Sequence, residues 1–136
     1  MTHEQSTARI TGLDHVQLTM PAGPEAEAAC RAFYLGALGL DEVEKPVVLR
    51  PRGGLWFQGP GFQLHLSIEE VMVTRRHPGL VTDDLEGMRT RIEAAGYATV
   101  DDPGLPGVRR FYVTDPFANR IEIQQHERSS GAAGSP

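Results

Sequence analysis

The sequence predicts an α+β fold in which one unit, a strand followed by a helix and three strands, occurs twice. Two observations support this prediction. Several short segments alternate apolar and polar residues with the period of two that half-buried strands show. Two longer segments carry apolar residues at spacings of three and four, as helices that cover a sheet do. The units occupy about 9–70 and 76–126 of a single domain that spans 9–126.

The first half begins with a strand predicted at 10–20, in which apolar residues alternate with polar ones that include His15 and Gln17. A Pro-Gly turn follows. Pro24 then suits the first turn of a helix, because proline lacks the N–H that would be unpaired there anyway. Gly39 suits the end of this helix, where a left-handed residue is common.

Three short strands complete the first half. They are predicted at 40–44, 54–58 and 62–68. In the last of them Gln63 and His65 lie opposite an apolar face, which repeats the pattern of the first strand. Trp56 and Gln58 share the less apolar face of the strand before it.

The second half repeats this order after a connector. Its predicted elements are a strand at 77–83, a helix at 84–95 and three strands at 97–101, 107–114 and 119–125, and the connector is 69–76. His77 opens the first of these strands. Glu122 interrupts the apolar alternation of the last one, and Tyr112 lies on the less apolar face of its neighbour.

Four side chains that can bind a metal ion occupy corresponding positions in the two halves. His15 and His77 lie in the strand before a helix, and His65 and Glu122 lie in the third strand after one. Three imidazoles and one carboxylate suit a divalent Zn, Ni, Fe or Mn ion better than Ca or Mg, which prefer oxygen ligands. The sequence therefore predicts one metal site, with the choice among these four metals open.

Composition excludes several classes of partner. The formal net charge of -5 opposes attraction to a nucleic acid backbone. No apolar run approaches the ~20 residues needed to span a bilayer, so no membrane span is expected. A single cysteine, Cys30, and no signal-peptide pattern at the start favour the cytoplasm. Polar or Gly/Ser/Ala-rich composition predicts disordered tails at 1–8 and 127–136.

The chain resembles the vicinal oxygen chelate superfamily, which includes glyoxalase I, bleomycin-resistance proteins and fosfomycin-resistance thiol transferases, over about 10–125. The segments that carry the resemblance are 12–18, 33–40, His77 with 94–96, and 111–122. The resemblance implies two βαβββ modules whose curled sheets form a cup. It also implies His15 and His77 as first-strand ligands, Glu122 as the last-strand carboxylate and His65 as the fourth ligand.

The resemblance further implies a metal-dependent enzyme of glyoxalase type, a lyase or isomerase. Its substrate would be a small oxygenated molecule chelated through two neighbouring oxygens, with Glu122 or His65 moving the proton. His65 stands where glyoxalase I carries a glutamate, which argues against that enzyme's own reaction. The expected substrate-binding residues are Gln17, Trp56, Gln58, Gln63 and Tyr112. A homodimer is expected, because modules of this superfamily often pair across two chains.

Two alternatives remain open at this point. One is a non-catalytic protein that binds an antibiotic, as bleomycin-resistance proteins do, and the other is a metal-dependent thiol transferase of fosfomycin-resistance type. Arg109 and Arg110 could contact an anionic substrate, or they could be the basic residues of an exposed edge strand.

Overall fold

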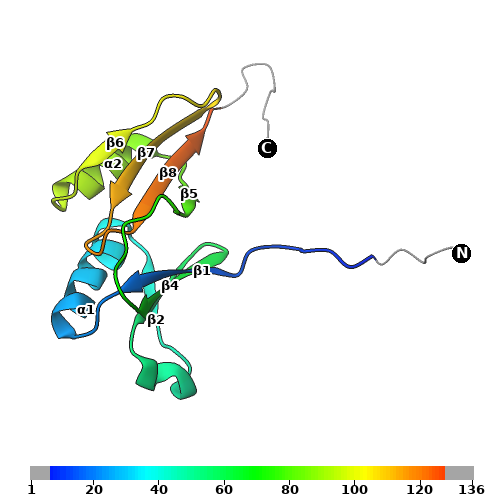
Figure 1. The fold of residues 1–136 in the computed structure, drawn as a ribbon. Coiled ribbons are helices and arrows are strands. Elements are labelled where there is room, and N and C mark those ends of the chain that lie inside the picture. The colour runs from blue at the N-terminus through cyan, green and yellow to red at the C-terminus, as the bar shows by residue number, and fades with distance from the viewer. Residues whose placement is uncertain (1–6, 128–136) are drawn as a thin grey trace, which may run out of the picture.

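The computed structural model describes residues 7–127, and Figure 1 shows its two halves one above the other. The elements of the first half are β1 (His15–Met20), α1 (Pro24–Arg31), the π-helix η1 (Ala32–Ala37), β2 (Asp41–Val43), the 3-10 helix η2 (Val47–Arg52), β3 (Leu55–Gly59) and β4 (Phe62–Ile68). Those of the second half are β5 (Gly79–Val81), α2 (Leu85–Ala94), β6 (Thr99–Asp101), β7 (Val108–Thr114) and β8 (Arg120–His126). Most of the predicted tails, 1–6 and 128–136, lies outside the described residues.

Within residues 7–127 the strands form two four-stranded sheets of the same topology. Sheet A has the order β1-β4-β3-β2, and sheet B has the order β5-β8-β7-β6. In each sheet the first and last strands along the chain pair in parallel, and the other pairs are antiparallel. The predicted α+β fold with two βαβββ modules is therefore confirmed. The two sheets remain separate and do not close into one barrel.

Each sheet has one apolar and one polar face, as the alternation predicts. In sheet A, Leu64 and Leu66 are buried beneath helix α1, and in sheet B, Ile121 and Ile123 are buried beneath α2. These residues belong to a core to which the helices contribute Phe33, Tyr34, Leu85 and Ile92. The opposite faces are thereby left for polar side chains, and all the predicted site residues except His77 lie on them.

The predicted strand at 10–20 was too long at its start. β1 begins at His15, because its partner β4 begins at Phe62 after a tight turn, and Gln63 is the residue that pairs with His15. Residues 7–13 have no described strand beside them, and Ile10 and Leu13 are exposed. Figure 1 shows this segment leading away from the lower half.

The strand predicted at 77–83 was also too long. β5 contains only Gly79–Val81, so His77 lies in the connector just before the strand rather than within it. Pro78 has no N–H for a sheet, and its carbonyl accepts the bond from Glu122 that begins the pairing. The 3-10 helix at 47–52 was not predicted, because its apolar residues Val47 and Val48 face solvent.

A buried cluster of hydrogen bonds joins the two halves at the turn between β7 and β8, which Figure 1 shows beside the helix of the first half. The Tyr34 hydroxyl donates to Asp115 Oδ2 at 2.6 Å. Asn119 Nδ2 donates both to Asp115 Oδ2 at 2.8 Å and to the Thr19 carbonyl at 2.7 Å. This cluster, the Asp115 turn, therefore ties sheet B to the helix and first strand of the other module.

Pro24 begins α1, and Gly39, which follows η1, has a φ of +74°, both as predicted. Asp84 caps α2 by accepting a hydrogen bond from the Gly87 N–H at 3.0 Å.

Among residues 7–127, no helix has the length and apolar composition that crossing a membrane requires.

Candidate functional site

The polar face of sheet A gathers the site residues predicted in the first half. Strand pairing sets His15 beside Gln63, Gln17 beside His65, and Trp56 on the other side of His65. Gln58 pairs with Gln63. These side chains therefore form one continuous surface, although they come from three strands.

His65 lies between two other rings. The Trp56 ring stacks on it at 3.8 Å with an interplanar angle of 2°, and the His15 ring stacks against it at 4.2 Å and 16°. This packing leaves His65 only 5% exposed. Burial, with a smaller contribution from His15, lowers the pKa of His65 to about 4, so the imidazole is neutral at neutral pH.

Hydrogen bonds fix which nitrogen of each of these rings carries a proton. His65 Nε2 lies 2.7 Å from Gln63 Oε1, which can only accept, so Nε2 carries the proton and Nδ1 keeps a lone pair. His15 Nδ1 lies 2.8 Å from Asp14 Oδ2 and is protonated for the same reason. A carboxylate behind a histidine is the usual way to orient a metal ligand, and it leaves His15 Nε2 available.

The polar face of sheet B surrounds Glu122. Tyr112 is its direct neighbour on β7, and Arg110 pairs with Gln124 beside it. Glu122 is 5% exposed and accepts hydrogen bonds at both oxygens, with Arg110 Nη1 3.4 Å from Oε1 and Gln124 Nε2 2.8 Å from Oε2. A buried carboxylate is tolerated here because its charge is met by these donors.

His77 and Glu122 meet in an arrangement that requires a positive species between them. His77 Nδ1 lies 2.8 Å from the Arg75 carbonyl, an acceptor, so Nδ1 carries the proton. His77 Nε2 lies 3.1 Å from Glu122 Oε1. In neutral imidazole this nitrogen holds a lone pair, which would face the lone pairs of a carboxylate. The contact is favourable only when a second proton or a metal cation is bound there.

Tyr112 packs among charged groups of this face. Its ring lies 3.7 Å from the Arg120 guanidinium carbon and meets the His77 ring edge-on at 5.2 Å. Burial, followed by the Glu122 charge, raises the pKa of Tyr112, so its hydroxyl stays protonated at neutral pH. Arg120 and Gln124 were not predicted as site residues. Their positions two residues before and after Glu122 on one strand could have indicated that they share its face.

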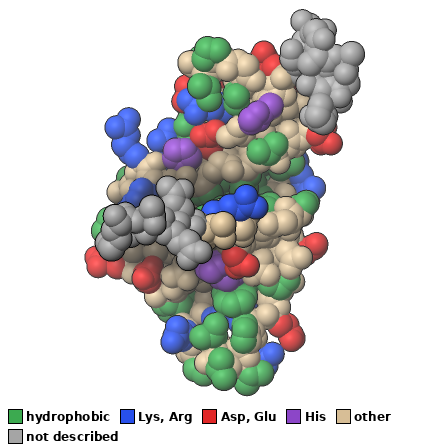
Figure 2. Space-filling view, turned by 90° about the vertical axis from the view of Figure 1, so that its right-hand side faces the viewer, with side chains coloured by type: hydrophobic (Ala, Val, Ile, Leu, Met, Phe, Trp, Pro, Cys, Tyr) green, Lys and Arg blue, Asp and Glu red, His purple; other side chains and the backbone are tan. Residues whose placement is uncertain are grey.

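The four predicted ligands thus occur as two pairs on two sheets. His15 lies against His65, and His77 lies against Glu122. Across residues 7–127, no three His, Cys, Asp or Glu side chains lie together in a way that could hold a metal ion. The face of the molecule drawn in Figure 2 carries histidine side chains on both halves. A complete four-ligand site therefore needs the two pairs to be brought together.

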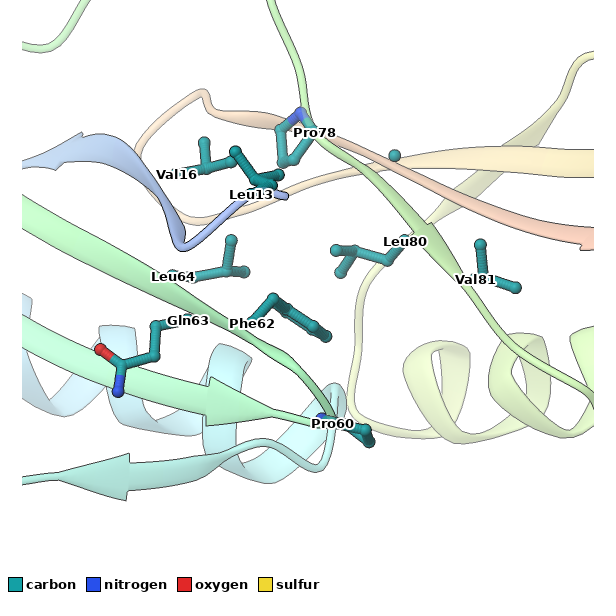
Figure 3. Close-up of a pocket in the computed structure, with 10 residues that line it drawn as sticks. Leu13, Val16, Pro60, Phe62, Gln63, Leu64, Pro78, Leu80 and Val81 are labelled. Carbon is teal, nitrogen blue, oxygen red and sulfur yellow. The ribbon is translucent and has the colours of Figure 1, made fainter. Parts of the chain in front are cut away.

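Two depressions lie where the modules meet. One of about 370 Å³ is apolar and is lined from both sheets by Val16, Phe62, Leu64, Pro78 and Leu80, which Figure 3 shows around a shared space. The other, of about 640 Å³, has Gln17 and Thr19 of β1 on one side and His77 with Arg76 on the other. The first is an apolar contact surface, and the second connects the polar face of sheet A to His77.

Comparison with known proteins decides the family. The sequence profile of the Glyoxalase/Bleomycin resistance protein/Dioxygenase superfamily matches residues 12–123. The chain belongs to this superfamily. A solved structure from Bacillus anthracis, described as a glyoxalase family protein, is 35% identical to it with a TM-score of 0.84, covering 90% of this chain and 100% of that one. A search of curated proteins gives no match.

Two more distant solved structures share the fold. Lactoylglutathione lyase from Agrobacterium tumefaciens is 20% identical with a TM-score of 0.67, covering 86% of this chain and 95% of its own. The fosfomycin resistance protein FosX from Listeria monocytogenes is 18% identical with a TM-score of 0.68, covering 90% and 94%. That structure is of a point mutant complexed with Mn(II) and 1S,2S-dihydroxypropylphosphonic acid. At these identities the likeness establishes the fold alone.

Proposed function

We propose that this protein is a metal-dependent enzyme, a lyase or isomerase of glyoxalase type, whose substrate is a small oxygenated molecule chelated through neighbouring oxygens. The observation that carries the proposal is the pair His77 Nε2 and Glu122 Oε1, two acceptor atoms 3.1 Å apart, which a bound cation would reconcile. Membership of the superfamily supports it, since a structure of FosX contains Mn(II).

The residues fit a divalent first-row metal. His15 presents an unprotonated Nε2, and His65 presents an unprotonated Nδ1. With His77 and Glu122 they supply three nitrogens and a carboxylate, a donor set suited to Zn, Ni, Fe or Mn. When bound, such an ion would polarise a substrate carbonyl and stabilise negative charge that develops on its oxygen.

The acid and base work is assigned to Glu122 and His65. Gln124 and Arg110 hold the Glu122 carboxylate in a fixed orientation, so proton transfer to one oxygen does not require the side chain to move. His65 is neutral because of its low pKa, so its Nδ1 lone pair would accept a proton in a site where His65 does not itself bind the metal. Gln17, Trp56, Gln58 and Gln63 would line the substrate side in sheet A, and Tyr112 in sheet B.

We further propose a homodimer in which the His15–His65 pair of one chain meets the His77–Glu122 pair of the other. β1 and β5 are edge strands, each with one side that no strand within residues 7–127 pairs. Exposed Leu13 and Val81 lie beside the apolar depression between the modules. Covering these edges would bury apolar surface and would supply each pair with the ligands that its own chain keeps apart.

Metal analysis tests the ligand set. Purified protein should bind one equivalent of Zn, Ni, Fe or Mn per chain, with a rise in melting temperature. His77→Ala and Glu122→Gln should lose the metal. His126→Ala should keep it, because His126 is an exposed residue at the far end of β8 and is not one of the four ligands. Wild-type protein that binds none of the four metals would overturn the proposal.

A mixing experiment tests whether the site spans two chains. A variant that lacks His15 and His65 and a variant that lacks His77 and Glu122 should each fail to bind metal. If the pairs meet across the dimer, mixed dimers regain one complete site of the two. If both pairs belong to one chain's site, mixing restores nothing, and a monomeric mass by light scattering would likewise contradict the dimer.

Proton exchange tests the chemistry. In D2O, metal-loaded protein should catalyse deuterium exchange at the carbon beside the carbonyl of small α-hydroxy carbonyl compounds, followed by proton NMR. Chelation of the metal and Glu122→Gln should each abolish the exchange. The metal would stabilise the charge on the substrate oxygen, and Glu122 would move the proton. Ligand affinity without turnover, insensitive to chelator, would instead indicate a binding protein.

A further inference from the structure

Arg120 lies on the polar face of sheet B, two residues before Glu122 on the same strand, β8. It is partly buried, and its guanidinium makes no hydrogen bond or ion pair with any residue of the described chain, 7–127. An arginine held against a protein surface usually has a carboxylate partner. The groups around Arg120 explain why it has no carboxylate partner here.

The carboxylates that bind Arg110 on this face are already committed to other groups. Glu122 is bonded to His77, Arg110 and Gln124. Asp102 accepts from Arg110 Nη2 at 2.9 Å. Arg110, the other arginine of this face, is thus neutralised by two acids, whereas the charge of Arg120 is not neutralised.

Arg109, on the same strand as Arg110, also has a carboxylate partner. It points to the opposite side of sheet B, where its Nη2 lies 2.9 Å from Glu86 Oε2 of helix α2. The sequence suggested Arg109 and Arg110 as contacts for an anionic substrate, but both are paired within the chain. The unneutralised cation beside Glu122 is Arg120.

Tyr112 holds Arg120 in place without neutralising it. The guanidinium carbon lies over the phenol ring, 3.7 Å from its centre. Stacking of this kind fixes the plane of the guanidinium, while its N–H groups, which point outward within that plane, remain free to donate. A planar fork of free donors matches two oxygens of a carboxylate, a phosphonate or a phosphate.

We propose that Arg120 binds an oxyanion group of the substrate, a carboxylate or a phosphonate or phosphate, on the Tyr112 platform. The proposal rests on the proposed function for its location beside Glu122, but the anion contact itself requires no metal. It adds a charge to the substrate class: the molecule would carry an anionic group as well as its neighbouring oxygens.

Arginine side-chain NMR tests the contact directly. The Nε–Hε signal of Arg120, identified by its loss in Arg120→Gln, is followed during titration with methylphosphonate and, separately, with acetate. We expect a saturable shift of this signal and an affinity at least about tenfold lower in Arg120→Gln, the cost of losing a charged hydrogen bond. Arg120→Lys should retain only part of the affinity, because an ammonium lacks the fork.

Arg109→Gln is the matched control, since it removes an arginine of the neighbouring strand whose partner is Glu86. It should leave both affinities unchanged. The stronger of the two probes identifies the geometry of the anion. Titrations in chelator-treated protein, together with the metal content of Arg120→Gln, separate the two proposals: a protein without metal that still shows Arg120-dependent binding supports this inference alone.

Two results would overturn the inference. One is saturable binding of either anion that is as tight in Arg120→Gln as in the wild type. The other is the absence of any saturable shift of the Arg120 signal with both anions. Circular dichroism of each variant establishes that it is folded, so neither result can be ascribed to unfolding.

Discussion

Tyr34→Phe removes one hydroxyl from the Asp115 turn, the cluster that ties the second module to the first. Tyr34 is fully buried, and its hydroxyl donates to Asp115 Oδ2 at 2.6 Å. Phenylalanine keeps the ring and therefore its packing against Phe33 and Phe57. The variant thus isolates a single hydrogen bond between elements far apart in the chain.

The expected cost follows from what Asp115 retains. A hydrogen bond to a charged group contributes about 1.5–3 kcal/mol. After the change, Asp115 Oδ2 still accepts from Asn119 Nδ2, and Oδ1 still accepts from two backbone N–H groups. The carboxylate is not left unpaired, so the loss belongs at the lower end, about 1.5 kcal/mol of unfolding free energy. For a domain of this size that corresponds to a melting temperature lower by about 6 °C.

Urea unfolding and calorimetry of the metal-free protein measure this loss. Tyr97→Phe is the control: Tyr97 packs edge-on against the same Phe33 ring at 4.9 Å and has no hydrogen bond from its hydroxyl within the described chain. Its cost should stay below about 0.5 kcal/mol. If Tyr34→Phe were no more destabilising than Tyr97→Phe, the Asp115 turn would not contribute to joining the modules as inferred.

Three further predictions concern single positions. Ala118 has φ +69°, which a side chain disfavours, so Ala118→Gly should raise stability by up to about 1 kcal/mol, measured by urea unfolding, whereas a loss of stability would contradict it. Gly54→Ala should lower the unfolding free energy by more than about 3 kcal/mol, because the new Cβ would lie 2.2 Å from the Leu66 carbonyl oxygen. Gly61→Ala, at a similar φ but with open space around it, should lower it by only about 1–2 kcal/mol. The pKa of His65 is about 4 in the folded protein and 6.5 in the unfolded chain, so the unfolded state binds the proton first as the pH falls. Metal-free protein should therefore lose stability between about pH 6.5 and pH 4, and His65→Gln should flatten that part of the stability profile.

The fold could be predicted because each element carries its own pattern. Alternation in β4 assigns Leu64 to the core and His65 to the polar face, and both assignments hold in the structure. The same reasoning failed at strand ends. His77 was predicted to lie within a strand, but the pairing of β5 with β8 begins only where the Glu122 N–H donates to the Pro78 carbonyl, and no local pattern contains that register.

For the site, the sequence by itself determined which side chains can face the polar side of each sheet, since the period of a strand is set locally. Only the tertiary structure decided which of them touch: His15 stacks on His65, and His77 meets Glu122. Nothing in a strand's alternation specifies its neighbours or their partners. For that reason the sequence left Arg109 and Arg110 open as contacts for an anion, and only the packed structure showed that their charges are paired while Arg120 remains unneutralised.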